Sequence, residues 1–81
     1  MVVLITFLGM QRAITKTDSI DMPITPETRV ADALEYVRRQ YPDLPLGKGM
    51  VNVAVNQKMT SLDTVLKPND VVSFLPYIAG G

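Results

Sequence analysis

The segment 28-TRVADALEYVRRQYP-42 decides the fold that the sequence predicts. Its apolar residues follow the i, i+3, i+4, i+7, i+11 spacing that places side chains on one face of a helix. They are Val30, Ala33, Leu34, Val37 and Tyr41. Thr28 is a residue type that caps helix N-termini, and Pro42 ends a helix because it lacks a backbone N–H. The segment therefore predicts one amphipathic helix with a single buried face.

Two extended segments are expected before this helix. Residues 2–8 are β-branched or apolar, which predicts a strand. One face of that strand carries Val3, Ile5 and Phe7. Gly9 permits a tight reversal. The polar stretch 11–21, with two isoleucines as its apolar points, is interpreted as a second, more exposed antiparallel strand.

Further extended segments are expected after the helix. Residues 43–49 contain two glycines and a proline, which is typical of a loop. Residues 51–56 alternate valine with Asn52, Ala54 and Asn56, which predicts a strand covered on one face. The following turn leads into a short edge segment near residues 59–60.

The last strand follows a turn. Residues 67–70, Lys-Pro-Asn-Asp, predict a type I turn with proline in its preferred position. In the strand over residues 71–75, we assign Val72 and Phe74 to the core and the alternate side chains to the outer face. The order of elements predicts an α+β domain in which one helix covers one face of a mixed sheet. The other face of the sheet is then open.

Composition excludes several classes of function. The 81 residues fit one small domain, and they contain no cysteine and no histidine. Thiolate nucleophiles, imidazole bases and the common zinc sites are therefore excluded. Eight basic residues balance eight acidic ones, so no net field attracts nucleic acid or an anionic membrane. The first apolar run is too short to span a bilayer, and we expect a soluble, cytoplasmic protein that binds no metal.

The final residues, 77-YIAGG-81, raise the main functional question. Two glycines offer only main chain and, at Gly81, a carboxylate, and at average glycine usage such a pair ends about one chain in two hundred by chance. Glycine lets an extended tail thread a narrow channel in another protein. We therefore predict a folded domain over residues 1–76 and a flexible tail over residues 77–81. The apolar residues Leu75, Tyr77 and Ile78, where the last strand leads into this tail, suggest an interaction patch.

Several segments together resemble a known family. They are 28-TRVADAL-34, 54-AVNQ-57, 66-LKPNDVV-72 and 75-LPYIAGG-81. In these segments and in the order of its predicted elements, the chain is similar to the MoaD/ThiS sulfur-carrier family. The resemblance covers essentially the whole chain and implies the ubiquitin-like β-grasp fold. Length and the Asn56-Gln57 turn are similar to the molybdopterin branch, whereas the ending Ile78-Ala79-Gly80-Gly81 is similar to the thiamine branch.

The resemblance implies a chemistry for Gly81. In this family, an activating enzyme uses ATP and magnesium to convert the terminal carboxylate into an acyl adenylate. Sulfur then displaces AMP and leaves a thiocarboxylate. The chain is then not an enzyme by itself and holds no stably bound cofactor. Residues Ile78, Ala79, Gly80 and Gly81 would insert into the partner's active site.

The same resemblance implies partners. The expected ones are a ubiquitin-activating-like adenylyltransferase and a synthase large subunit of the molybdopterin type, and they would dock on Leu75, Pro76, Tyr77 and Ile78. Delivery of sulfur for molybdopterin is the leading hypothesis. A thiamine-type carrier, a ubiquitin-like modifier joined to lysine through Gly81, and a β-grasp binding module with an inert tail are the alternatives.

Overall fold

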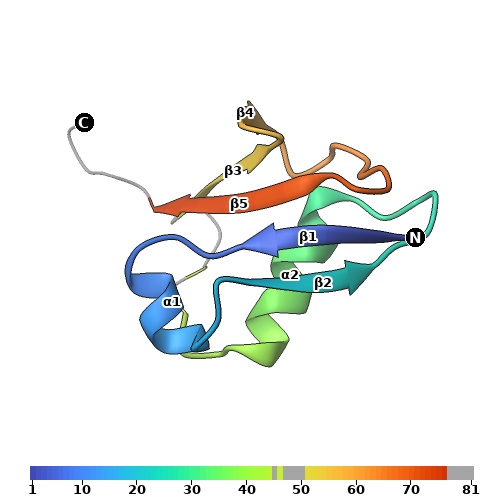
Figure 1. The fold of residues 1–81 in the computed structure, drawn as a ribbon. Helices are drawn as coiled ribbons and strands as arrows, with labels where there is room; N and C mark the ends of the chain where they lie inside the picture. Colours follow the sequence, from blue (N-terminus) through green and yellow to red (C-terminus); the bar gives the residue numbers. More distant parts are fainter. Residues whose placement is uncertain (45, 47–50, 77–81) are drawn as a thin grey trace.

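The structure, a computed structural model, describes residues 1–44, 46 and 51–76. These residues form two helices and five strands (Figure 1). In chain order they are β1 (Val2–Thr6), α1 (Met10–Thr15), β2 (Ser19–Pro23), α2 (Val30–Gln40), β3 (Val51–Val55), β4 (Lys58–Thr60) and β5 (Val71–Pro76).

The strands form one mixed sheet in the order β2-β1-β5-β3-β4. The first and last strands lie side by side and run parallel, with Ile5 paired to Val72. The other neighbours are antiparallel; Ile5 also pairs with Ile20 in β2, and Val53 in β3 pairs with Phe74 in β5. This topology confirms the predicted α+β class and the β-grasp fold, and it makes β5 the central strand.

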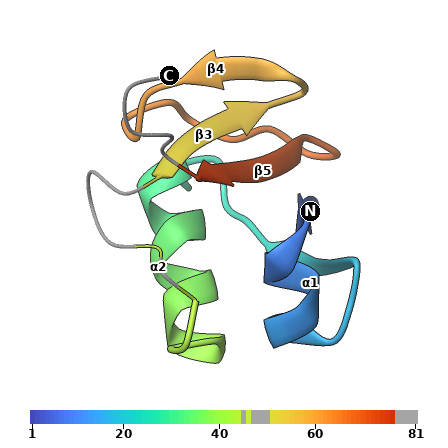
Figure 2. The ribbon, with the colours of Figure 1, turned by 90° about the vertical axis from the view of Figure 1, so that its left-hand side faces the viewer.

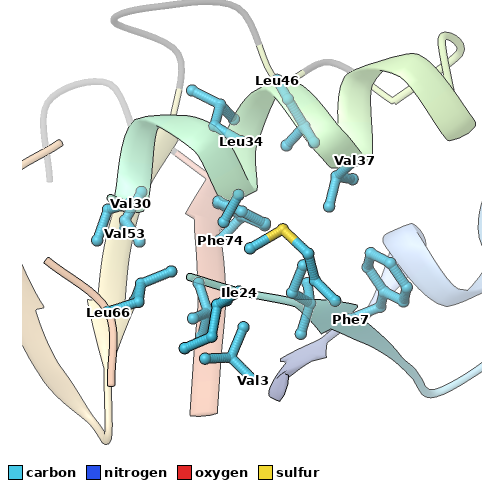
Figure 3. Close-up of a cluster of buried hydrophobic side chains, with 14 of the residues drawn as sticks. Val3, Phe7, Ile24, Val30, Leu34, Val37, Leu46, Val53, Leu66 and Phe74 are labelled. Carbon is cyan, nitrogen blue, oxygen red and sulfur yellow. The ribbon is translucent and has the colours of Figure 1, made fainter. Parts of the chain in front are cut away.

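Helix α2 lies along one face of this sheet (Figures 1 and 2). The hydrophobic core lies between the helix and the sheet. The predicted helix face is confirmed, since Val30, Ala33, Leu34 and Val37 are buried. Figure 3 shows Val30 and Val37 on the side of α2 that faces sheet residues such as Val53 and Phe74, which belong to the same cluster. The core strand residues Val3, Ile5, Val72 and Phe74 are fully buried, as their alternation predicted.

The start of α2 differs from the prediction by one residue. Arg29, with extended backbone angles, is the N-cap in place of Thr28. Its backbone N–H donates to the Asp32 carboxylate at 2.8 Å, which also places a negative charge at the positive end of the helix. Thr28 instead accepts a hydrogen bond from the Thr25 N–H at 2.9 Å, so its hydroxyl closes the preceding turn.

The stretch 11–21 was wrongly assigned to a single strand. Helix α1 occupies its first part, and β2 begins only at Ser19. The buried residues of α1 are the polar Gln11 and Thr15, one helical turn apart, whereas Met10 and Ile14 are exposed. Because hydrophobic periodicity assumes that apolar residues are the buried ones, this inverted pattern hid the helix.

Two further core residues were missed in the segment after α2. Leu44 and Leu46 are 6% and 2% exposed and belong to the main cluster. Backbone bonds from Leu44 N to Tyr41 O and from Leu46 N to Leu44 O fold this segment back against the domain. Tyr41 itself packs against Phe7 in a T-shaped arrangement, with ring centroids 5.6 Å apart. The segment therefore contributes to the core although its composition is that of a loop.

Two turns depend on left-handed backbone. Asn56 and Gln57 have φ values of 52° and 70° between the paired residues Val55 and Lys58, which matches the type I′ turn that joins two antiparallel strands. Asn69 has a φ of 69°, so the turn before β5 is of type II rather than the predicted type I. Asparagine tolerates this conformation better than most residues.

Gly9 is the glycine whose backbone angles matter most for the position of α1. Its φ of 51° and ψ of −123° lie in a region that L side chains rarely adopt, and a Cβ added there would meet no atom within 4 Å. We expect Gly9→Ala to lower the free energy of unfolding by about 1–3 kcal/mol through backbone strain alone. Urea denaturation measures this loss.

The matched control for Gly9→Ala lies at the other end of the same helix. Lys16 has a φ of 63° in the left-handed region, where glycine is favoured after a helix. Lys16→Gly should therefore be neutral or stabilising. A Gly9→Ala variant as stable as the wild type would show that the chain can turn into α1 without a positive φ.

Neither of the helices described is long and apolar enough to cross a membrane.

Candidate functional site at the end of strand β5

The predicted tail follows the central strand of the sheet. Pro76 is the last residue of β5 and pairs with Val51, while Leu75 pairs with Asn52. The strand that leads to the tail is therefore held by β3 up to its final residue. Residues Tyr77, Ile78, Ala79, Gly80 and Gly81 lie outside the described part of the chain. Their roles remain predictions.

The face of the sheet opposite α2 carries the predicted interface residue Leu75. It is half-buried, and it shares this face with Val71 and Ser73 because Val72 and Phe74 point into the core. Neighbouring strands add further apolar side chains to the same face. These are Val2 and Leu4 from β1, Ala54 from β3 and Met59 from β4.

A polar pair lies at the centre of this outer face. The hydroxyls of Thr6 and Ser73 are 2.6 Å apart and hydrogen-bonded, and Thr6 Oγ1 also donates to the Val72 carbonyl at 3.3 Å. Around the pair, Val2 and Met59 remain 43% and 58% exposed. The face thus exposes apolar side chains on β1 and β4, as protein-binding surfaces often do, and the polar pair at its centre is hydrogen-bonded.

On the β1 side, the end of β5 is held by a residue that the sequence did not single out. The side chain of Gln11 donates from Nε2 to the Phe74 carbonyl at 2.8 Å and accepts from the Leu8 N–H at 3.0 Å. It is only 9% exposed. The sequence carries no usable signal for this residue. Gln11 and Thr15 are both buried, but the burial of polar residues cannot be predicted from the residue types alone.

The charged residues of the described chain indicate no catalytic centre. Three exposed ion pairs join Arg12 to Asp18 and Glu35 to Arg38 and Arg39, at 3.5–3.7 Å. Such pairs contribute little to stability and mark no site. No group of three or more acidic residues in the described ranges could hold a metal ion.

Two further features of the described residues do not indicate a binding or catalytic site. Asp70 accepts from the backbone N–H of Lys67 at 2.8 Å and from the Asn56 side chain at 2.9 Å, so it stabilises two neighbouring turns. A surface hollow of about 420 Å³ is lined by α2 residues of both charge signs, which favours no single class of ligand; the lining is Asp32, Glu35, Tyr36, Arg39 and Gln40.

Comparison with known families identifies the chain. The model of the ThiS family matches residues 5–81, which includes all five strands except the first residues of β1 and extends through Gly80-Gly81. The chain belongs to the ThiS family. This confirms the resemblance drawn from the segments around the helix, the last turn and the tail.

Individual relatives agree with the family. The molybdopterin synthase sulfur carrier subunit of Mycobacterium tuberculosis is 32% identical over 75 residues, which are 93% of this chain and 90% of that protein. A chain in the complex of subunits 1 and 2 of the molybdopterin-converting factor from Helicobacter pylori is 27% identical, with a TM-score of 0.66 and full coverage of both chains.

A third relative comes from another functional class. The small archaeal modifier protein 1 of Methanosarcina acetivorans has a TM-score of 0.79 and 23% identity, and the match covers 99% of this chain and 96% of that one. At this identity the likeness concerns the fold. The same architecture thus occurs in proteins named as sulfur carriers and as modifiers.

Proposed function

We propose that this ThiS-family protein is a sulfur carrier whose Gly81 carboxyl group is adenylated and then converted to a thiocarboxylate. The observation that carries the proposal is the family match over residues 5–81, because it includes the Gly80-Gly81 ending together with the domain. The chain has no cysteine or histidine of its own. The chemistry at Gly81 is therefore assigned to the active site of a partner.

The proposed reaction removes the negative charge that makes a carboxylate a poor electrophile. A Gly81 carboxylate oxygen attacks the α-phosphorus of ATP, and the bond to the leaving pyrophosphate breaks. Sulfide, the simplest sulfur donor, then attacks the carbonyl carbon of the acyl adenylate and expels AMP. The product is a C-terminal thiocarboxylate, in which one oxygen has been replaced by sulfur.

ATP and magnesium are substrates of the activating enzyme in this scheme. The part that this chain plays is to deliver the tail. Gly80 and Gly81 lack side chains, and Ala79 is small, so this end of the chain can enter a narrow channel and bring its carbonyl carbon close to the bound nucleotide. Ile78 would fill the entrance of that channel.

The outer face of the sheet is the proposed docking surface for both partners. It is the face that α2 does not cover, and it continues along β5 through Leu75 and Pro76 towards the tail (Figure 1). A partner bound there would meet the tail directly, with Tyr77 and Ile78 at the boundary. Both an adenylyltransferase and a synthase large subunit would use this surface, and the Helicobacter pylori complex between subunits 1 and 2 supports the second partner.

Replacement of Leu75 by arginine tests this surface. We expect Leu75→Arg to raise the KM of the activating enzyme for the carrier at least about tenfold, because a charge is desolvated in the contact. The melting temperature should change little, since Leu75 is only half-buried. Val65→Arg is the matched control, because Val65 is a 40% exposed valine in the loop before β5. Equal KM values for the two variants would place the docking surface elsewhere.

Molybdopterin synthesis is the proposed destination of the sulfur. The name of the Mycobacterium tuberculosis relative supports this choice over thiamine synthesis. The test is growth of a host that lacks its own molybdopterin synthase small subunit, scored by the activity of a molybdenum enzyme. Restored activity supports the molybdopterin role; restored thiamine prototrophy in a thiamine-carrier mutant, without molybdenum enzyme activity, would reverse the choice.

A modifier that is joined to lysine through Gly81 is the second candidate. The likeness to an archaeal modifier protein supports it. Intact-mass measurement after incubation with ATP, sulfide and the host's activating enzyme separates the two. Exchange of one oxygen for sulfur supports the carrier, and lysine-linked adducts in host extracts support the modifier. An unchanged mass together with no adducts would contradict both.

A further inference from the structure

The parallel ladder between β1 and β5 ends before β5 does. Leu4 N donates to Asp70 O at 2.9 Å, and the register continues to the pair Thr6 and Ser73. In a parallel ladder, donors recur at every second residue and their acceptors advance by the same step. The rung after Thr6 in this series would therefore join the N–H of Leu8 to the carbonyl of Phe74.

The side chain of Gln11 occupies the place of that rung. It accepts from the Leu8 N–H and donates to the Phe74 carbonyl, which are the two groups that the ladder would have joined directly. A carboxamide offers one acceptor and a donor in the same plane, as a peptide group does. The chain has already turned into α1 at this point (Figure 1). Gln11 therefore continues the hydrogen bonding of the sheet from a helix.

The Gln11 side chain fixes β5 on the side that faces β1. On the β3 side, pairing extends to Pro76. On the β1 side, Gln11 supplies the contact at Phe74, two residues before the end of the strand. Without it, the buried Phe74 carbonyl would either lose its partner or draw β5 towards another donor. A movement of β5 towards another donor would alter the direction in which the chain leaves the sheet.

We infer that Gln11 is a positioning residue for the tail. It holds the end of β5 in a fixed place relative to the outer face, so that a partner docked on that face receives residues 77–81 at the entrance of its active site. This inference rests on the proposed function. The observation that the Gln11 carboxamide replaces a rung of the ladder does not depend on the proposed function.

The hydrogen bond itself is tested on the wild-type protein by NMR. The side-chain NH₂ protons of Gln11 should exchange with solvent at least about tenfold more slowly than those of an exposed glutamine. Gln40 and Gln57 are exposed and serve as internal references. Equal exchange rates for the three side chains would overturn the inference.

The positioning role is tested with two variants that remove different parts of the contact. Gln11→Glu keeps the acceptor for Leu8 but loses the donor to Phe74, and Gln11→Met loses both at similar size. We expect both variants to lower the kcat of adenylation about tenfold, because the Gly81 carboxylate reaches a productive position less often. The KM should stay within about twofold, because the docking face is unchanged.

Ile24→Val is the control for a general loss of stability. Ile24 is buried at the opposite end of the sheet, next to the start of β1, where its N–H donates to the Met1 carbonyl. The Ile24→Val variant should lower the melting temperature by a few degrees without changing the kcat of adenylation. If the Gln11 variants melt lower but keep the wild-type kcat, Gln11 is structural only. If the wild type itself is not adenylated, the proposed function fails with the positioning role, and the exchange measurement still decides the bond.

Discussion

Removal of Gly81 is expected to abolish thiocarboxylate formation. The truncated chain still ends in a glycine carboxylate, but that group lies one residue, about 3.5 Å of extended chain, short of the bound nucleotide. Proximity of the reacting atoms supplies much of the rate in such a step, so a shortfall of this size should lower adenylation by more than about a hundredfold. Pyrophosphate release measures the rate, and intact mass shows whether sulfur is added.

A second variant carries one extra residue after Gly81. An extra alanine displaces the carboxylate in the opposite direction and places a side chain in the channel, and we expect the same loss. Both variants should bind the activating enzyme through the outer face and compete with the wild type. A truncated or extended chain that is adenylated at the normal rate would remove Gly81 from the proposed mechanism.

Replacement of Phe74 by alanine should have the largest effect on stability. Phe74 is fully buried on the central strand, among side chains from α2 and β3 (Figure 3). Truncation of a buried phenylalanine costs about 3–5 kcal/mol, because contacts are lost and a cavity remains. Small domains are stable by only about 5–15 kcal/mol, so much of the folded population is at risk at 37 °C. Urea denaturation with the wild type alongside measures the loss.

Phe74→Leu is the matched control, since it keeps an apolar side chain in the same space and should cost much less than alanine. Substitution of Val65, which is 40% exposed, by alanine should be nearly neutral. Similar losses for Phe74→Ala and Val65→Ala would contradict the central place of Phe74 in the core.

Regular periodicity explains which elements could be predicted. The face of α2, the alternation of β1 and the core residues Val72 and Phe74 all place apolar side chains inwards, so pattern and burial agree. Helix α1 breaks this rule, because it buries Gln11 and exposes Met10. The type II turn was missed because Lys-Pro-Asn-Asp suits both turn types, and only the backbone angle of Asn69 separates them.

The residues of the candidate site also differ in whether the sequence could predict them. Leu75 on the outer face could be predicted, since the alternation of β5 alone places it there. Gln11 could not, because its hydrogen bond to Phe74 joins residues 63 positions apart, and no local pattern marks a glutamine as a ladder element. Long-range contacts of this kind become visible only when the order of strands is known.

The central place of β5 has a consequence for synthesis of the chain. A nascent chain that stops before Val71 lacks the strand that joins β1 to β3, together with the buried Val72 and Phe74. The edges of β1 and β3 that pair with β5 then stay unpaired, and the core against α2 lacks its central side chains. Folding of the domain must wait for its last strand to be made. A folded docking face therefore forms only in a chain that already contains Val71–Pro76, the strand that directly precedes the proposed sulfur-carrying residues.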